Sequence, residues 1–168
     1  MPTLEQTWSL PIPGDHPRIF VSNTNFLSTI FGAPSVAILQ TRIAITHAAN
    51  YSSLLSQAAA IQGNAASYFM ARDAEFLGCL AFAYLLDPVA NLTYGTAAVA
   101  RALEIATIDD ADNQNRRNHV LQLAYVYDWA YALLTTLERA TIRQRISDIV
   151  GGYINANGNF GGLRFVND

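Results

Sequence analysis

One carboxylate lies inside an aromatic and otherwise uncharged run of the sequence. Asp128 is surrounded by Tyr125, Tyr127, Trp129 and Tyr131 in AYVYDWAYALL, which leaves no wide polar face when it is projected on a helix. A buried carboxylate needs hydrogen-bond partners, because burying an unpaired charge is costly. In the favoured interpretation, Asp128 accepts hydrogen bonds from a neighbouring helix, a loop amide or an arginine, and so locks the packing.

A second interpretation gives the same residues a binding role. Asp128 would face a water-filled cleft and hold a polar ligand, while the nearby rings provide stacking surfaces. Such a combination suits sugars, whose C–H faces stack on rings while their hydroxyls form hydrogen bonds. This hypothesis names Tyr127, Asp128, Trp129 and Tyr131 as cleft residues.

A basic cluster precedes this run. The stretch NQNRRNH contains Arg116, Arg117, Asn118 and His119. We interpret it as the first turns of a helix, partly exposed to solvent, with His119 a surface or packing residue. The alternative is an anion-binding cluster.

The other residues able to do chemistry form weaker patterns. The three histidines are scattered, and with the single cysteine they give no metal-ligand spacing, so we expect no metal and no cofactor. Arg72 and Glu75 are three residues apart and indicate an ion pair rather than an acid–base site. Cys79 lies in an apolar run, which predicts a buried small side chain and excludes an internal disulfide.

Composition limits the class of protein. The chain has 168 residues, of which 51% are hydrophobic and only 14% are charged, which indicates one domain of largely covered helices. A net charge of −3 provides no electrostatic basis for binding nucleic acid or an acidic membrane. The apolar run at 76–86 is too short to span a bilayer, and no secretory signal is visible at the start.

The chain divides into three segments. Residues 1–34 contain five of the six prolines and predict an extended lead-in, whereas residues 156–168 form an irregular Gly/Asn-rich tail. Residues 35–155 show helical periodicity without strand-like alternation. We therefore expect an all-α domain of consecutive, mainly antiparallel helix hairpins.

Capping and breaking residues set the expected helix ends. Ser35 and Asn50 are candidate N-caps, and Thr135 with Glu138 has capping-box spacing. The helices that we expect to be longest and most enclosed are 65–86, ending before Asp87-Pro88, and 112–134. More amphipathic helices are expected at 90–107 and 137–153.

Three motifs together resemble a known family. HPRIFVS, LAFAYLLDP and LAYVYDWAYALLTTLERATIRQRI occur in the order and rough spacing found in heparinase II/III-like polysaccharide lyases and related alginate lyases. The resemblance covers about residues 16–150. It implies an (α/α) toroid, with a polysaccharide cleft on its inner ring of helices.

That resemblance also implies a reaction. The family cleaves uronic-acid polysaccharides by β-elimination, using residues on inner helices that follow the Tyr-Asp-Trp motif. The chain ends about 40 residues beyond Asp128, so we expect an incomplete toroid, an inactive isolated chain and unknown catalytic residues. Asp128 would organise the cleft wall, and the cluster at residues 116–119 would at most bind a uronate. The expected partner is an acidic polysaccharide, and the family suggests a secreted or periplasmic protein.

Two other classes remain open. The chain could be a non-catalytic helical module that binds glycans or proteins, or a scaffold in which Asp128 only holds packing. An incomplete toroid should expose an apolar edge, so we also expect self-association.

Overall fold

The computed structural model describes residues 35–63, 76–108 and 113–153. Within these ranges the chain is all-α, as expected, and no helix there is long and apolar enough to cross a membrane. The expected lead-in, the tail, residues 65–75 of the helix expected at 65–86 and the Arg72–Glu75 pair lie outside the described residues. The elements are α2 (Val36–Ile45), α3 (Ala48–Gly63), α4 (Leu77–Leu86), α5 (Leu92–Thr107), α6 (Asn113–Trp129), the 3-10 turn η3 (Tyr131–Leu133) and α7 (Thr136–Tyr153).

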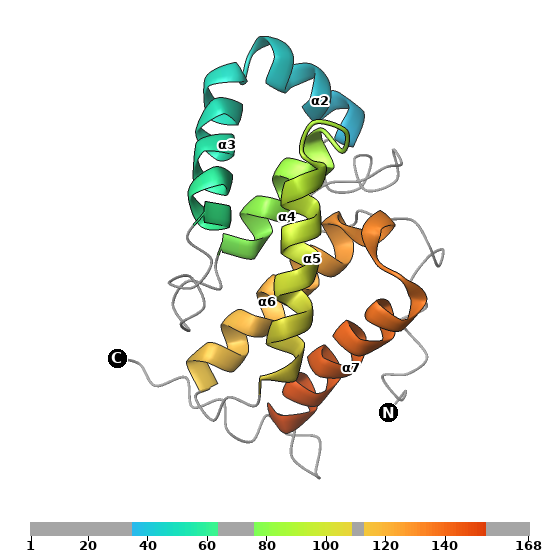
Figure 1. Cartoon of the computed structure of the whole chain (residues 1–168). Helices are drawn as coiled ribbons and strands as arrows, with labels where there is room; N and C mark the ends of the chain where they lie inside the picture. Colours follow the sequence, from blue (N-terminus) through green and yellow to red (C-terminus); the bar gives the residue numbers. More distant parts are fainter. Residues whose placement is uncertain (1–34, 64–75, 109–112, 154–168) are drawn as a thin grey trace, which may run out of the picture.

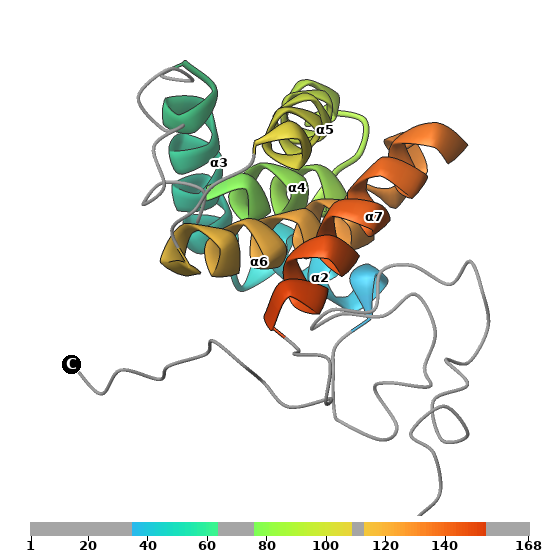
Figure 2. The same cartoon turned by 90° about the horizontal axis from the view of Figure 1, so that it is seen from below.

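Helices that are close in the sequence are also the ones that contact each other. Each substantial helix–helix contact in the described part joins an element to the next one or to the next but one. Thus α4 contacts α2, α3, α5 and α6, while α5 also contacts α3 and α7. Figures 1 and 2 show α4 and α6 near the centre, with α5 and α7 beside them.

The core forms where α4, α5, α6 and α7 meet. Leu80 of α4, Leu123 and Val126 of α6, and Ile142 of α7 are the largest side chains with almost no exposed surface. Eight of the ten residues of α4 are buried, whereas α5 buries only one face. The expected contrast between enclosed and amphipathic helices is therefore present for α4 and α5.

Two glycines allow close packing in this core. A Cβ on Gly78 would come within 3.0 Å of the Tyr125 ring, and one on Gly95 would come within 2.6 Å of the Tyr84 ring. The second distance is shorter than real Cβ contacts, so any side chain at Gly95 would force α4 and α5 apart.

Several expected helix ends are confirmed. Ser35 accepts a hydrogen bond from the amide of Ile38, as an N-cap does. Thr135 accepts from the Glu138 amide, while the Glu138 carboxylate accepts from the Thr135 amide, which completes the capping box. Helix α4 ends at Leu86, directly before Asp87-Pro88.

Two helix ends were predicted wrongly. Asn50 is not an N-cap, because α3 already begins at Ala48 and the Tyr51 amide bonds to the His47 carbonyl. Helix α6 ends at Trp129 rather than at Leu134. The chain there tightens into η3, where the Leu133 amide bonds to the Ala130 carbonyl.

Candidate functional site

Asp128 lies in the last turn of α6 and is only 4% exposed. Val126, on the same helix, and Ala130, directly after it, have no exposed surface at all. Burial to this degree agrees with the interpretation in which the carboxylate organises the packing. Its binding role stays a prediction.

The aromatic residues around Asp128 form two separate groups. Tyr125 and Trp129 stack in nearly parallel fashion, with ring centroids 4.7 Å apart, and Phe82 of α4 lies 5.0 Å from Trp129. Tyr127 instead meets Tyr131 edge-to-face at 5.6 Å. Since positions two apart project about 200° away from each other on a helix, Tyr127 and Trp129 leave α6 in different directions. The role of these residues in lining a cleft stays a prediction.

Tyr131 is held by an arginine that the sequence interpretation did not include. The guanidinium carbon of Arg139 lies 3.8 Å from the centre of the Tyr131 ring. The same guanidinium donates a hydrogen bond of 3.1 Å from Nη2 to the Tyr131 carbonyl. A cation–π contact and a carbonyl hydrogen bond together fix the turn between α6 and α7. Tyr131 therefore has a clear packing role.

The basic cluster is split by the helix that carries it. His119 is only 3% exposed, so it is a packing residue, one of the two roles expected for it. Arg117 is exposed, while Arg116 and Asn118 are half-buried. The side chain most available to an anion in solution is therefore Arg117.

A buried amide joins α4 to α6. The side-chain oxygen of Gln122, a residue that is 4% exposed, accepts a hydrogen bond of 2.8 Å from the backbone amide of Gly78. The residue before Gly78 starts α4, so this amide is among those that a helix leaves without an intrahelical partner. The sequence analysis missed this role, because only the fold brings residues 44 positions apart together.

Asn91 forms a second buried polar link. Its side-chain Nδ2 donates to the Tyr51 hydroxyl at 2.7 Å and to the Ala83 carbonyl at 2.8 Å. Asn91 directly precedes α5 and is 5% exposed. The sequence analysis gave Asn91 no role, because nothing local to the sequence points to Tyr51.

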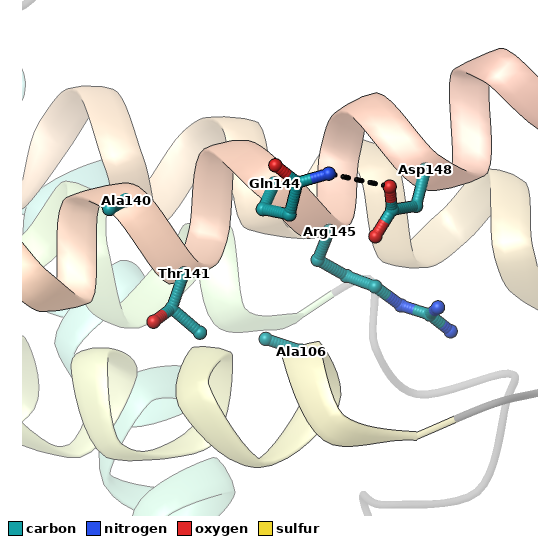
Figure 3. A pocket seen from close by; sticks show the side chains of 6 residues that line it. All are labelled: Ala106, Ala140, Thr141, Gln144, Arg145 and Asp148. Atoms are coloured by element: carbon teal, nitrogen blue, oxygen red, sulfur yellow. Dashed lines mark hydrogen bonds between the residues drawn. The ribbon is translucent and has the colours of Figure 1, made fainter.

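Three surface pockets are lined by described residues other than the predicted cleft residues. One, of about 460 Å³, lies between α5 and α7 (Figure 3), where Gln144 donates to Asp148 at 2.7 Å and Arg145 donates to the Ile108 carbonyl. A second, of about 420 Å³, follows α3 along Ala49, Asn50, Ser53, Leu54 and Gln57. The third, of about 480 Å³, is lined by Gln40, Ile43, Ala44, Tyr51, Leu86, Asp87 and Pro88.

Three side chains in the described part of the chain have clearly shifted pKa values. Burial raises the pKa of the Cys79 thiol and of the Tyr84 phenol, which keeps both groups protonated and unreactive at neutral pH. Hydrogen bonds from Thr135 lower the pKa of the Glu138 carboxyl. None of these three groups belongs to the predicted cleft.

The described residues contain no group of three metal-ligating side chains. Comparisons with protein-family models, curated proteins and solved structures find no match for this chain. Its function must therefore be inferred from its own residues.

Proposed function

We propose that the chain is the N-terminal helical part of a polysaccharide lyase-like (α/α) toroid. In its complete form, such a protein cleaves uronic-acid polysaccharides by β-elimination. The observation that carries the proposal is the order of helix contacts, in which each element packs on the next and the next but one. Two concentric rings of hairpins require this pattern, since inner helices pack on inner ones and outer helices on outer ones.

The contacts assign the helices to two rings. Helices α2, α4 and α6 form a connected series, because α4 contacts both α2 and α6. Helices α3, α5 and α7 form the other, because α5 contacts both α3 and α7. The first series holds the most enclosed helix, α4, as well as Asp128 and Trp129. It would be the inner ring.

The substrate-facing residues follow from this assignment. Phe82 of α4, with Tyr125 and Trp129 of α6, forms a partly exposed aromatic group on two helices of the inner series. A sugar ring would stack on it through its C–H face. Arg117, exposed on α6, would attract the uronate carboxylates. Asp128, buried beneath, would hold α6 in place.

The complete reaction needs more than these residues supply. The proton at C5 of a uronic acid is weakly acidic, so a base must remove it while other groups offset the carboxylate's negative charge. We assign no catalytic residue within the chain. We therefore expect it to bind uronan chains without turning them over.

Incubation with alginate and glycosaminoglycans tests this proposal. Unsaturated uronate products absorb in the ultraviolet, and we expect none, whereas calorimetry should detect binding. Trp129→Ala and Arg117→Ala should each weaken binding about fivefold or more, with Arg143→Ala, exposed on α7, as the matched control. Thermal unfolding must show that each variant remains folded.

Two results would contradict the proposal. Robust product formation would show that the chain already holds a catalytic centre, and an absence of uronan binding would remove the substrate class. Self-association provides a second readout, because an incomplete ring leaves hairpin edges uncovered. A chain that stays monomeric at high concentration in light scattering would count against the ring.

A further inference from the structure

The pocket between α2, α3 and the end of α4 combines aliphatic and polar surface. It has a volume of about 480 Å³, within the range of small-molecule sites. Its walls are aliphatic, and its polar groups come from Gln40, Tyr51 and Asp87. Figure 1 shows the turn after α4 close to α2, so the pocket forms where three segments of the chain meet. It lies on other residues than the aromatic group proposed for uronan binding.

A buried side chain holds the Tyr51 hydroxyl at this pocket. Asn91 directs Nδ2 to the Tyr51 oxygen at 2.7 Å and is itself anchored to the Ala83 carbonyl. An amide that is 95% buried is costly unless it is fully hydrogen-bonded, so this link fixes its members in one geometry. Tyr51 is thereby oriented before any ligand arrives.

The link leaves the Tyr51 proton available. Because the phenol oxygen accepts from Asn91, its own O–H can act as a donor, and no described residue takes that proton. Asp87 provides the complementary acceptor. Its Oδ1 accepts from the Ala90 amide at 3.0 Å, which orients the carboxylate, and no described group donates to its Oδ2.

We propose that this pocket binds a neutral sugar ring. One fixed donor and one fixed carboxylate acceptor suit the hydroxyls of a sugar, each of which both donates and accepts. The aliphatic walls cover the C–H face of the ring. A uronate is disfavoured because Asp87 is the one formally charged residue among the described residues of the lining and would repel it. An organic ammonium would satisfy Asp87 but leave the Tyr51 donor unused.

Nuclear magnetic resonance titration of the whole labelled chain tests the site. The probes are methyl glucoside, methyl galactoside and cellobiose as neutral sugars, with glucuronate and butylamine as the charged comparisons. We expect saturable shifts of the Ala44 and Leu86 amides with a neutral sugar, and a dissociation constant on the order of 1–10 mM. Glucuronate should bind at least fivefold more weakly.

Two variants separate the site from mere surface contact. Tyr51→Phe removes the donor but keeps the ring, and Asp87→Asn removes the charge but keeps an acceptor for the Ala90 amide. Each should weaken sugar binding about fivefold, while Ser53→Ala, in the neighbouring pocket along α3, should not change it.

Several outcomes would overturn the proposal. These are no saturable shift with any neutral sugar, unchanged affinity in both variants, glucuronate binding as tightly as the neutral sugars, or butylamine binding more tightly than they do. The readout is local to this pocket and does not involve Trp129 or Arg117. Its failure is therefore distinguishable from failure of the lyase-like proposal.

Discussion

Helices α2 and α4 are equally long and mainly apolar but differ in burial. Both have ten residues, α4 has no charged side chain and α2 has one, Arg42. Yet eight residues of α4 are buried, whereas only Val36 of α2 is. The difference agrees with position, because α4 packs on four helices and α2 packs on two, and with composition, because α2 also contains Gln40, Thr41 and Arg42.

This comparison separates apolar character from stability. A helix gains free energy from the apolar area that it removes from water, not from its composition. We therefore expect changes in the enclosed α4–α5–α6 region to be costly, and matched changes at the α2–α3 edge to be mild.

The largest difference is expected for aliphatic truncation. Leu80→Ala in α4 removes a side chain that is 1% exposed, and should lower the free energy of unfolding by about 3 kcal/mol. Ile38→Ala in α2, where the side chain is 44% exposed, should cost less than about 1 kcal/mol. Urea unfolding followed by circular dichroism measures both. Equal losses would show that the α2 edge is covered as fully as the core.

Substituting the glycines should have the second-largest effect on stability. Gly95→Ala would place a Cβ 2.6 Å from the Tyr84 ring and 2.7 Å from Leu133, and the resulting overpacking should cost about 2 kcal/mol. Gly63→Ala, at the end of α3, meets nothing within 4 Å and should be neutral or slightly stabilising. Thermal unfolding compares the two variants. A neutral Gly95→Ala would mean that α5 can move away from α4 without loss.

Much of this fold could be predicted from the sequence, because its signals are local. The Ser35 cap, the Thr135–Glu138 box and the stop at Asp87-Pro88 each depend on residues within a single turn. The end of α6 was missed, and the contacts just beyond it come from another helix. The Tyr131 carbonyl is bonded to Arg139, on the next helix, which no periodicity in residues 124–134 could reveal.

The candidate site was less predictable for the same reason. Projecting residues 124–134 on a helix predicted a buried Asp128, because that stretch is apolar on all sides, and the structure confirms the burial. It could not show that Tyr127 and Trp129 join different aromatic groups, because their partners, Tyr131 and Phe82, depend on the turn and on α4. The links from Gln122 to Gly78 and from Asn91 to Tyr51 likewise depend on contacts between helices.

A comparison of two glutamines should give an intermediate effect. Gln122→Ala leaves the buried Gly78 amide without its acceptor, and should destabilise the protein by about 1.5 kcal/mol. Gln62→Ala, on α3, removes only an exposed hydrogen bond of 3.3 Å to the Thr93 carbonyl and should cost about 0.5 kcal/mol or less. Hydrogen exchange at Gly78 adds a local measurement, since its amide should exchange faster in Gln122→Ala alone. Unchanged exchange there would mean that water or another group replaces the glutamine.

The smallest effects are expected at the two helix caps. Thr135→Ala removes the side-chain acceptor of the Glu138 amide but keeps the Thr135 amide, which donates to the Glu138 carboxylate. Ser35→Ala removes the acceptor of the Ile38 amide. Each variant loses one bond of 3.3 Å and should cost about 1 kcal/mol or less. Of these two caps, only the capping box contains a titratable group, so only its contribution to stability depends on pH. Because hydrogen bonds from Thr135 lower the pKa of Glu138 in the folded chain, its contribution is complete above the unfolded value of 4.5 and is lost as pH falls through the lower folded value. Glu138→Gln should remove this part of the acid dependence of stability while keeping an acceptor for the Thr135 amide. If the Gln variant loses stability in acid as steeply as the parent chain, the Glu138 carboxylate does not contribute to the acid dependence of the protein's stability.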